Sequence, residues 1–115
     1  MNMREYIKSD AVNKNLNIGS QTKHIRGSHN FDPGRSEVYG TIEDMQRLVD
    51  VYHGTGEVRG HSLREGAPLM EFIVLDSPIG IYREITTGEE YETNTFTIRY
   101  GKKGAHIVPA RRVIR

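Results

Sequence analysis

YETNTFTIRYGKKGAHIVPA, residues 91–110, predicts a β-hairpin and decides the fold. Its turn, from Gly101 to Gly104, is symmetric about a pair of lysines, so Arg99 should lie opposite His106. Side chains alternate along a strand, and this register therefore places two sets of residues on opposite faces. The face expected in the core carries Phe96, Ile98, Tyr100, Ala105 and Ile107. The other face carries Thr95, Thr97, Arg99 and His106, with Val108 as an apolar intruder.

Further strand-forming runs precede this hairpin. MEFIVL (70–75) and IGIYREI (79–85) are rich in β-branched and aromatic residues. Each run ends in turn-forming residues, DSP (76–78) after the first and TTGEE (86–90) after the second. Read in chain order, these segments predict an antiparallel meander.

The clearest helix is TIEDMQRLVDVYHG, residues 41–54. Thr41 is a suitable N-cap, Asp44 stands at the capping-box position, and Gly54 ends the helix. Residues 25–40 contain several glycines and a proline and should be mostly loop. Residues 1–20 are expected to be a loosely held lead-in with room for a short helix.

The predicted fold class is therefore α+β. N-terminal helical and loop elements and one main helix should pack on an antiparallel sheet of about four strands. The 115 residues are enough for a single domain, 1–115, with one buried core.

Composition narrows the function classes. The chain has no cysteine, so disulfides and thiolate metal sites are excluded, and a net charge of +1 makes bulk attraction to nucleic acid weak. No run approaches the roughly 20 apolar residues of a membrane span, so no membrane partner is expected. The basic residues gather in 21–36 and in 99–115, which indicates a local anion site.

Two clusters combine imidazoles with cations. QTKHIRGSHN (21–30) carries Lys23, His24, Arg26 and His29, and the polar face of the hairpin carries Arg99 and His106. Without a functional role, the first cluster would be part of a surface loop and the second would be the solvated face of an amphipathic hairpin. His53 suits a helix end, and His61 lies in the polar segment GHSLREG, so neither is a candidate.

Most routes to hydrolysis lack their motif here. The chain has no GxSxG elbow, P-loop, GxGxxG or HExxH sequence, and no cysteine nucleophile. RNA, however, carries its own nucleophile, the 2′-OH, beside the scissile phosphate. Its cleavage needs a general base, a general acid and groups that hold negative charge, and these are the residue types in both clusters.

KHIRGS (23–28), FDPGRS (31–36), LVDVYHGTGE (48–57) and NTFTIRYGKKGAHIVPA (94–110) resemble the polymorphic toxin type 50 domain. The resemblance covers roughly residues 14–111. Members lie at the C-termini of bacterial secreted toxins and of some phage head-morphogenesis proteins. The resemblance implies a predicted RNase of the barnase/EndoU/colicin/RelE-like group, with helical elements before an antiparallel sheet.

The resemblance places functional residues at Lys23, His24, Arg35, Ser36, Thr97, Tyr100 and His106, and the loop cluster and the polar hairpin face add Arg26, Thr95 and Arg99. The catalytic candidates are His24, Lys23, Arg35, Thr97, His106 and Tyr100, and the substrate-binding candidates are Arg26, Ser36, Thr95 and Arg99. His24 and His106 would transfer protons, Arg35 and Lys23 would hold phosphate charge, and Thr97 would donate to a non-bridging oxygen. Each role has a non-catalytic alternative. His24 could be an ordinary surface histidine, Arg35 could pair with Asp32 or Glu37, and Thr97 could be present for its strand propensity. For Tyr100 the two arguments disagree, because the resemblance places it near the site whereas the hairpin register places it on the core face.

These observations predict a metal-independent endoribonuclease toxin domain, needing no cofactor, that leaves a 2′,3′-cyclic phosphate. The alternative is a non-catalytic nucleic-acid- or partner-binding module of a phage or secreted protein, and an ADP-ribosyltransferase ranks last. Expected partners are RNA and a cognate immunity protein that would cover the basic pole, and a monomer is expected. The place of action would be the cytoplasm of a target bacterium after secretion or delivery, or alternatively the virion.

Overall fold

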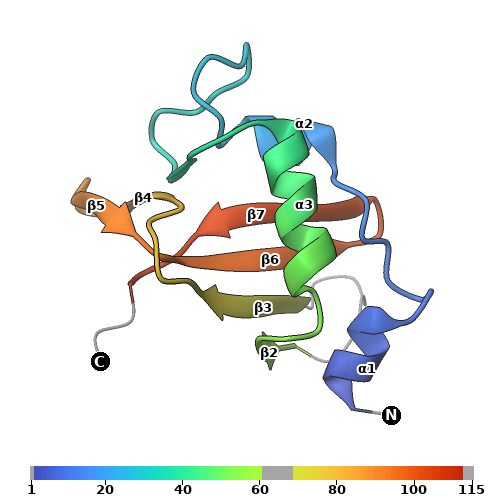
Figure 1. Ribbon diagram of the computed structural model, residues 1–115. Helices are drawn as coiled ribbons and strands as arrows, with labels where there is room; N and C mark the ends of the chain where they lie inside the picture. Colours follow the sequence, from blue (N-terminus) through green and yellow to red (C-terminus); the bar gives the residue numbers. More distant parts are fainter. Residues whose placement is uncertain (1, 61–68, 113–115) are drawn as a thin grey trace.

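A computed structural model describes residues 2–60 and 69–112, so His61 and its segment lie outside the described residues (Figure 1). The elements, in chain order, are α1 (Met3–Lys8), α2 (Ile18–Thr22), β1 (Glu37–Val38), α3 (Ile42–Tyr52), β2 (Glu57–Arg59), β3 (Leu69–Val74), β4 (Gly80–Arg83), β5 (Glu90–Thr93), β6 (Thr95–Gly101) and β7 (Gly104–Pro109). They confirm the α+β class. Among the described residues, no helix is long and apolar enough to cross a bilayer.

The hairpin β6–β7 has the predicted register. Arg99 pairs with His106, Ile98 with Ile107, and Tyr100 with Ala105. This hairpin forms half of an antiparallel four-stranded sheet in the order β2-β3-β6-β7. All five residues expected on the core face are buried.

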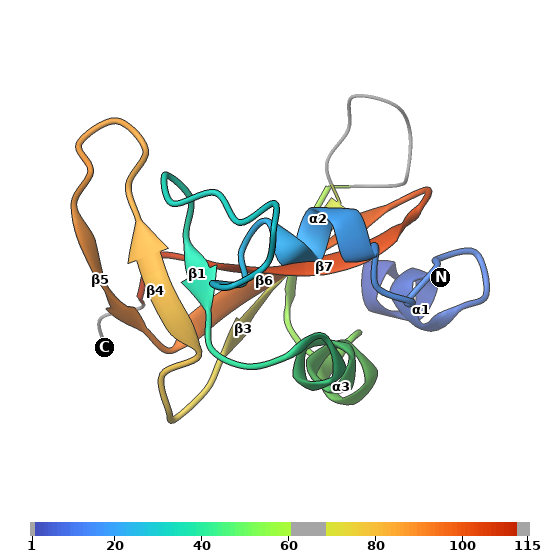
Figure 2. The same cartoon turned by 90° about the horizontal axis from the view of Figure 1, so that it is seen from above.

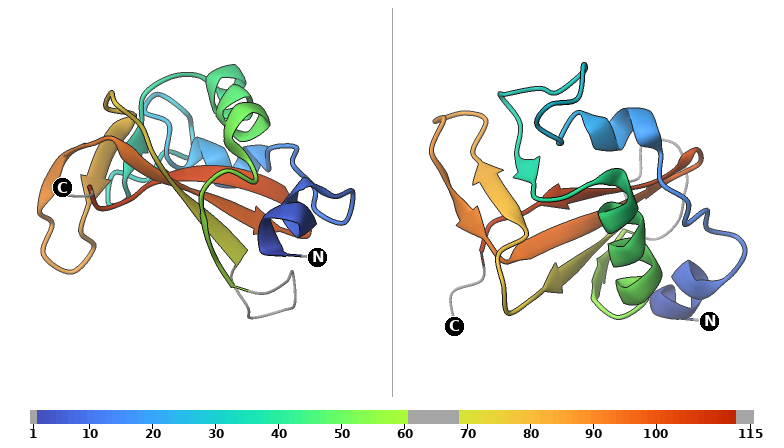
Figure 3. Two further views of the ribbon diagram at one scale, coloured as in Figure 1. Left: turned by 60° about the horizontal axis from the view of Figure 1, so that its bottom comes forward. Right: turned by 45° about the horizontal axis from the view of Figure 1, so that its top comes forward.

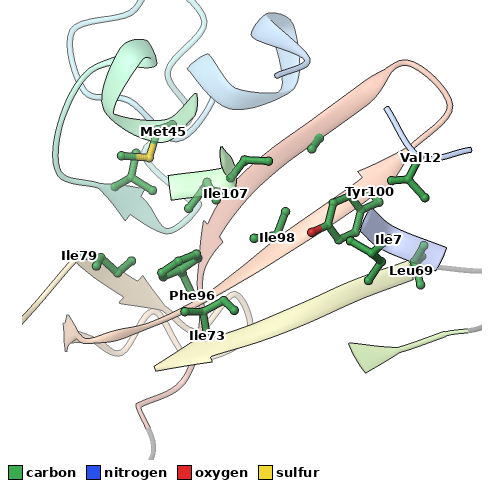
Figure 4. Close-up of a cluster of buried hydrophobic side chains, with 13 residues drawn as sticks. Ile7, Val12, Met45, Leu69, Ile73, Ile79, Phe96, Ile98, Tyr100 and Ile107 are labelled. Carbon is green, nitrogen blue, oxygen red and sulfur yellow. The ribbon is translucent and has the colours of Figure 1, made fainter. Parts of the chain in front are cut away.

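Helix α3 begins and ends where the sequence predicts. The Thr41 hydroxyl accepts from the Asp44 N–H at 3.2 Å, and the Asp44 carboxylate accepts from the Thr41 N–H at 2.8 Å, which completes the capping box. Gly54 ends the helix with a φ of +77°, a left-handed conformation that favours glycine. Met45 and Val49 are buried against the sheet. Figure 4 shows Met45 above Ile107, Ile98 and Phe96 in the main core.

The predicted meander is wrong, because the chain changes sheets at Asn94. The Asn94 carbonyl accepts from the Leu75 N–H at 2.9 Å and its side-chain amide donates to the Leu75 carbonyl at 2.8 Å. These bonds end one strand and start the next, so residues predicted as one strand become β5 and β6. Strand β3 pairs with β6, and β4 and β5 pair in a second, three-stranded sheet of order β1-β4-β5. Figure 2 shows the β4–β5 hairpin rising on the side of the sheet away from α3.

The first twenty residues are not loosely held. Ile7 is 0% exposed and Val12 is 2% exposed, so both belong to the core. The Lys14 ammonium donates to the carbonyls of Ile7, Ser9 and Val12 at 2.7–3.0 Å, which closes the turn after α1. The segment then runs beside the sheet to α2 (Figure 3). Its apolar residues are scattered in sequence but converge on one face once the turn closes.

Gln21, in α2, binds the open side of β7. Its side-chain amide donates to the Ile107 carbonyl at 3.0 Å, and its amide oxygen accepts from the Ile107 N–H at 2.7 Å. Asn17 and Asn15 make two further main-chain bonds to Ala105. The start of the 23–36 loop is therefore fixed directly alongside β7.

Candidate functional site

His24 is a buried histidine with a defined tautomer. Its carbonyl accepts from the Val38 N–H at 2.9 Å, so the loop closes on β1. Its ring Nδ1 lies 2.7 Å from the Ser36 carbonyl oxygen. A carbonyl only accepts, so Nδ1 must carry the proton. Nε2 of the neutral ring then keeps a lone pair and can accept a proton.

Ser36 connects this loop to the second sheet. Its hydroxyl accepts from the Arg83 N–H of β4 at 2.9 Å, while its carbonyl holds His24. The residue is 7% exposed. Ser36 is thus bonded to β4 on one side and to the His24 ring on the other, which fixes the position of the ring.

His106 lies against His24. The two rings stack with centroids 6.0 Å apart and an interplanar angle of 20°. His106 comes from β7, where the register places it opposite Arg99. The early loop and the late hairpin, separated by about 80 residues of chain, therefore meet at these two imidazoles.

A cavity of about 230 Å³ adjoins the two rings. Five of the ten predicted site residues line it: His24, Arg35, Ser36, Arg99 and His106. Proton-transfer groups and guanidinium groups thus share one concave space. This is the arrangement that acid–base chemistry on a phosphodiester requires.

Both imidazoles favour the neutral form. Burial, and then the nearby His24 and Arg99, lower the pKa of His106 to about 4. Burial also lowers the pKa of His24, with the cations Arg35 and Arg99 adding to that effect against the Ser36 hydrogen bond. The cavity is therefore electropositive even with both rings uncharged, which favours an anion in it.

A known protein family matches most of this chain. The model for the family described as bacterial toxin 50 matches residues 16–109. The chain belongs to the bacterial toxin 50 family. The matched region holds the whole cavity, and the match confirms the resemblance drawn from the sequence motifs. No curated protein matches the sequence.

Membership makes the chain a bacterial toxin domain. A toxin of this kind is delivered to target cells and implies a cognate immunity protein in the cell that makes it.

Three basic candidates of the toxin domain stand in different relations to the cavity. Arg35 lines it while forming an ion pair with Asp32 at 3.0 Å, the pairing expected as its structural alternative. Arg26 grips the Glu37 carboxylate through Nε and Nη2 and is not among the lining residues. Lys23 does not line the cavity either, although its charge acts on His106.

Thr95 and Thr97 are buried rather than presented on an open face, at 1% and 2% exposed. In the sheet register Thr97 lies between Phe72 and Val108. Its hydroxyl donates to the Val108 carbonyl at 3.2 Å and receives the Nε–H of Arg99 at 3.4 Å. Thr97 thus positions Arg99, and its own hydroxyl proton is already committed.

Tyr100 lies on the core face, as the register predicts, and away from the cavity. Its hydroxyl donates to the buried Glu71 carboxylate at 2.5 Å. Burial and this bond raise the pKa of Tyr100 far above its usual range. The expected reach around the strand end is not found, because Glu71 holds the hydroxyl on the opposite side of the sheet from His106.

Sequence reasoning missed Tyr82 and Glu84, which also line the cavity. Hydrogen bonds from Arg111, Tyr82 and Thr86 lower the pKa of Glu84 to about 2. A carboxylate with so low a pKa is a poor proton acceptor, so His24 is the better base. The sequence signal for these residues is the charged pair Arg83–Glu84 in YREI (82–85), a segment that was interpreted only as a strand. Among residues 2–60 and 69–112, no group of three potential His, Asp or Glu ligands could hold a metal ion.

Acid should destabilise the fold through His106. Its folded pKa of about 4 lies below the ordinary value of 6.5, so the unfolded chain takes up the proton first as the pH falls. The free energy of unfolding should therefore decrease from pH 6.5 towards pH 4, by about 2–3 kcal/mol from this group. Urea denaturation at pH 7 and pH 4.5 measures this loss of stability. The substitution His106→Asn should largely remove the loss, whereas the control His29→Asn, outside the cavity, should leave it unchanged. Equal acid losses in both variants would contradict the prediction.

Proposed function

We propose that this toxin domain is a metal-independent endoribonuclease that cleaves RNA by transesterification. The 2′-oxygen forms a bond to phosphorus and gives up its proton, the bond from phosphorus to the 5′-oxygen breaks, and that oxygen takes up a proton. The products are a 2′,3′-cyclic phosphate and a free 5′-OH. The observation that supports this best is a pair of stacked imidazoles and three guanidiniums, those of Arg35, Arg83 and Arg99, on one cavity.

His24 is the general base of the proposal. The Ser36 carbonyl holds the proton on Nδ1, so the free lone pair is on Nε2. Its lowered pKa keeps the ring neutral at physiological pH, which is the form that accepts a proton.

His106 is the general acid. In the free protein its low pKa leaves little of the protonated form at pH 7. A phosphodiester placed among these groups adds negative charge beside the ring, which raises the pKa of His106. The ring then takes up a proton from solvent and can donate it to the departing 5′-oxygen. Arg35 and Arg99 would hold the extra charge on the phosphorane, with Lys23 contributing at longer range.

Cleavage should be fastest on the acid side of neutrality. The reaction needs His24 neutral and His106 protonated, and both pKa values lie below 6.5, that of His106 near 4. The profile of kcat/KM against pH reports the free enzyme and should be bell-shaped, with its maximum between about pH 4 and 6.5. Stopped cleavage assays on a fluorogenic oligoribonucleotide measure it. A maximum above pH 7.5 would exclude this assignment of acid and base.

The experiment that tests the function is incubation of the folded domain with total RNA in excess EDTA, followed by end-group analysis. Fragments carrying 2′,3′-cyclic phosphate and 5′-OH ends support the proposal. Intact RNA at high protein concentration, with folding verified by circular dichroism, would overturn it. The non-catalytic alternative expected His24 far from Arg35, Thr97 and His106. Arg35 and His106 share a cavity with His24, while Thr97 does not line it.

The setting of the activity follows from the same proposal. RNA is reached in the cytoplasm of a target bacterium, so the domain would act there after delivery. It would act as a monomer, because one chain supplies every group that the proposed step uses. An immunity protein with an acidic face would fit the basic rim of the cavity.

A further inference from the structure

A second and larger hollow of about 800 Å³ lies on the face of the sheet that points away from α3. Met70, Phe72, Thr97 and Arg99 contribute to its floor from β3 and β6. The side chains of Arg4, Arg59 and Arg111 stand around it. We name this hollow the arginine groove. Of its described lining residues, the proposed reaction uses Arg99 alone.

The arginine groove adjoins the cavity of the two histidines. Tyr82, Arg99 and Pro109 line both spaces, so they form a shared wall. A chain-like ligand whose phosphate lies between His24 and His106 can therefore pass Arg99 and enter the groove. A compact ligand would have no reason to occupy both.

The charge of the groove suits a polyanion. Its described lining has four arginines, Arg4, Arg59, Arg99 and Arg111, against one carboxylate, Glu57. Glu57 lies 3.7 Å from Arg59, and Arg111 is paired with Glu84 at 3.0 Å. The Nε–H of Arg4 donates to the Gly56 carbonyl at 2.8 Å and that of Arg99 donates to the Thr97 hydroxyl at 3.4 Å. No carboxylate among the described residues forms an ion pair with either arginine, so binding a phosphate breaks no ion pair of theirs.

The groove also offers a stacking surface. The Arg59 guanidinium carbon lies 4.3 Å from the centre of the Phe72 ring, so the planar group is held over the ring. The Arg59 side chain is 64% exposed, which leaves its outer surface open. Unpaired bases stack on guanidinium planes supported in this way, and they do so with any base identity.

We propose that the arginine groove is a subsite for single-stranded RNA, which binds the nucleotides next to the scissile phosphate. One base stacks on the Arg59–Phe72 pair, and Arg99 contacts the backbone phosphate between that base and the cavity. Arg4, which is bonded to the Gly56 carbonyl next to the edge strand β2, contacts a phosphate at the other end of the groove. The assignment rests on the proposed function for the identity of the ligand. It makes the toxin domain a nuclease for unpaired RNA, because a base within a duplex cannot reach the stacking pair.

The test is a binding measurement that needs no cleavage. A fluorescein-labelled single-stranded RNA hexamer with 2′-fluoro groups keeps the size of RNA but lacks the nucleophile. Its dissociation constant, measured by anisotropy, should rise about five- to a hundred-fold in Arg59→Ala, and the slope of log K against log salt should fall by about 0.7. Arg47→Ala is the matched control, because Arg47 is 68% exposed on α3, is paired with Asp44 and lies outside the groove.

A second variant and a second probe separate stacking from charge. Phe72→Leu keeps an apolar side chain but removes the aromatic ring under Arg59, so it should weaken binding of the hexamer. A 2′-fluoro duplex of the same sequence should bind much more weakly than the hexamer to the unmodified domain and to both variants. Equal affinity for hexamer and duplex, or unchanged hexamer affinity in both variants, would overturn the subsite. Groove-dependent binding by a domain that leaves RNA intact would retain the subsite and overturn the nuclease, so the two failures are distinct.

Discussion

Replacing His24 with asparagine should lower kcat/KM for RNA cleavage by about 100- to 10,000-fold, the range for loss of a general base. The asparagine amide can occupy the position of Nδ1 and donate to the Ser36 carbonyl, which His24 now contacts at 2.7 Å. The loop should therefore keep its closure on β1 and β4, while the lone pair of Nε2 disappears. Initial rates on a defined oligoribonucleotide measure the effect.

His29→Asn is the control for this substitution. His29 lies five residues further along the same loop and does not line the cavity, so the chemical change is the same while the site is untouched. We expect its cleavage rate to equal that of the unmodified domain. Retention of more than a tenth of the activity by His24→Asn, with an unchanged unfolding curve, would remove His24 from the proposed mechanism.

Replacing Glu71 with glutamine should destabilise the domain by about 2–4 kcal/mol without changing the cavity. The Glu71 carboxylate is fully buried and accepts from three donors: the N–H groups of Gly54 and Gly56, at 2.9 and 2.8 Å, and the Tyr100 hydroxyl. A glutamine turns one acceptor oxygen into a donor, which leaves buried N–H or O–H groups facing an N–H. Each unsatisfied buried group costs about 1–3 kcal/mol.

Urea denaturation gives the free energies, with the exposed Glu57→Gln on β2 as the matched control. Tyr100→Phe should cost less, about 1–2 kcal/mol, since it removes one donor and leaves the carboxylate bound by two others. Its kcat should be unchanged, because Tyr100 acts on the core side of the sheet. A large loss of kcat in folded Tyr100→Phe would return this residue to the catalytic site.

The local elements could be predicted because their signals lie within a few residues. The capping box of α3 needs only Thr41 and Asp44, and the register of β6–β7 follows from the turn between Gly101 and Gly104. Such features depend on neighbours in sequence, so propensity and alternation determine them.

The sheet order could not be predicted, because it depends on contacts between distant residues. The pairing of β3 with β6 joins Leu69 to Tyr100 across 31 positions of chain. Nothing in the sequence of either strand indicates which strand is its partner. The change of sheet at Asn94 depends on its bonds to Leu75, in a run that otherwise alternates as one strand. The buried residues of the lead-in were missed for a similar reason, since Lys14 makes their turn through main-chain carbonyls.

The candidate site was predictable in its residue types and only partly in its geometry. The family motifs placed His24, Arg35 and His106 in one site, and the structure brings them to one cavity. Alternation alone assigned Thr97 to the same open face, but it cannot show that Thr97 is buried and that its hydroxyl is bonded to the Val108 carbonyl. The cavity wall at Tyr82 and Glu84 comes from the second sheet, which the sequence did not reveal.

The contacts of Gln21 and its neighbours with β7 have a consequence for self-association. An unpaired outermost strand is a template on which another chain can add a strand of its own. On one edge of the four-stranded sheet, residues 15–21 already satisfy the main chain of Ala105 and Ile107. On the other, β2 spans three residues and carries the charges of Glu57 and Arg59, both of which disfavour such templating. The four-stranded sheet is thus protected against edge-to-edge aggregation, and a protein that neutralises the domain at this sheet must recognise side chains rather than add a strand to it.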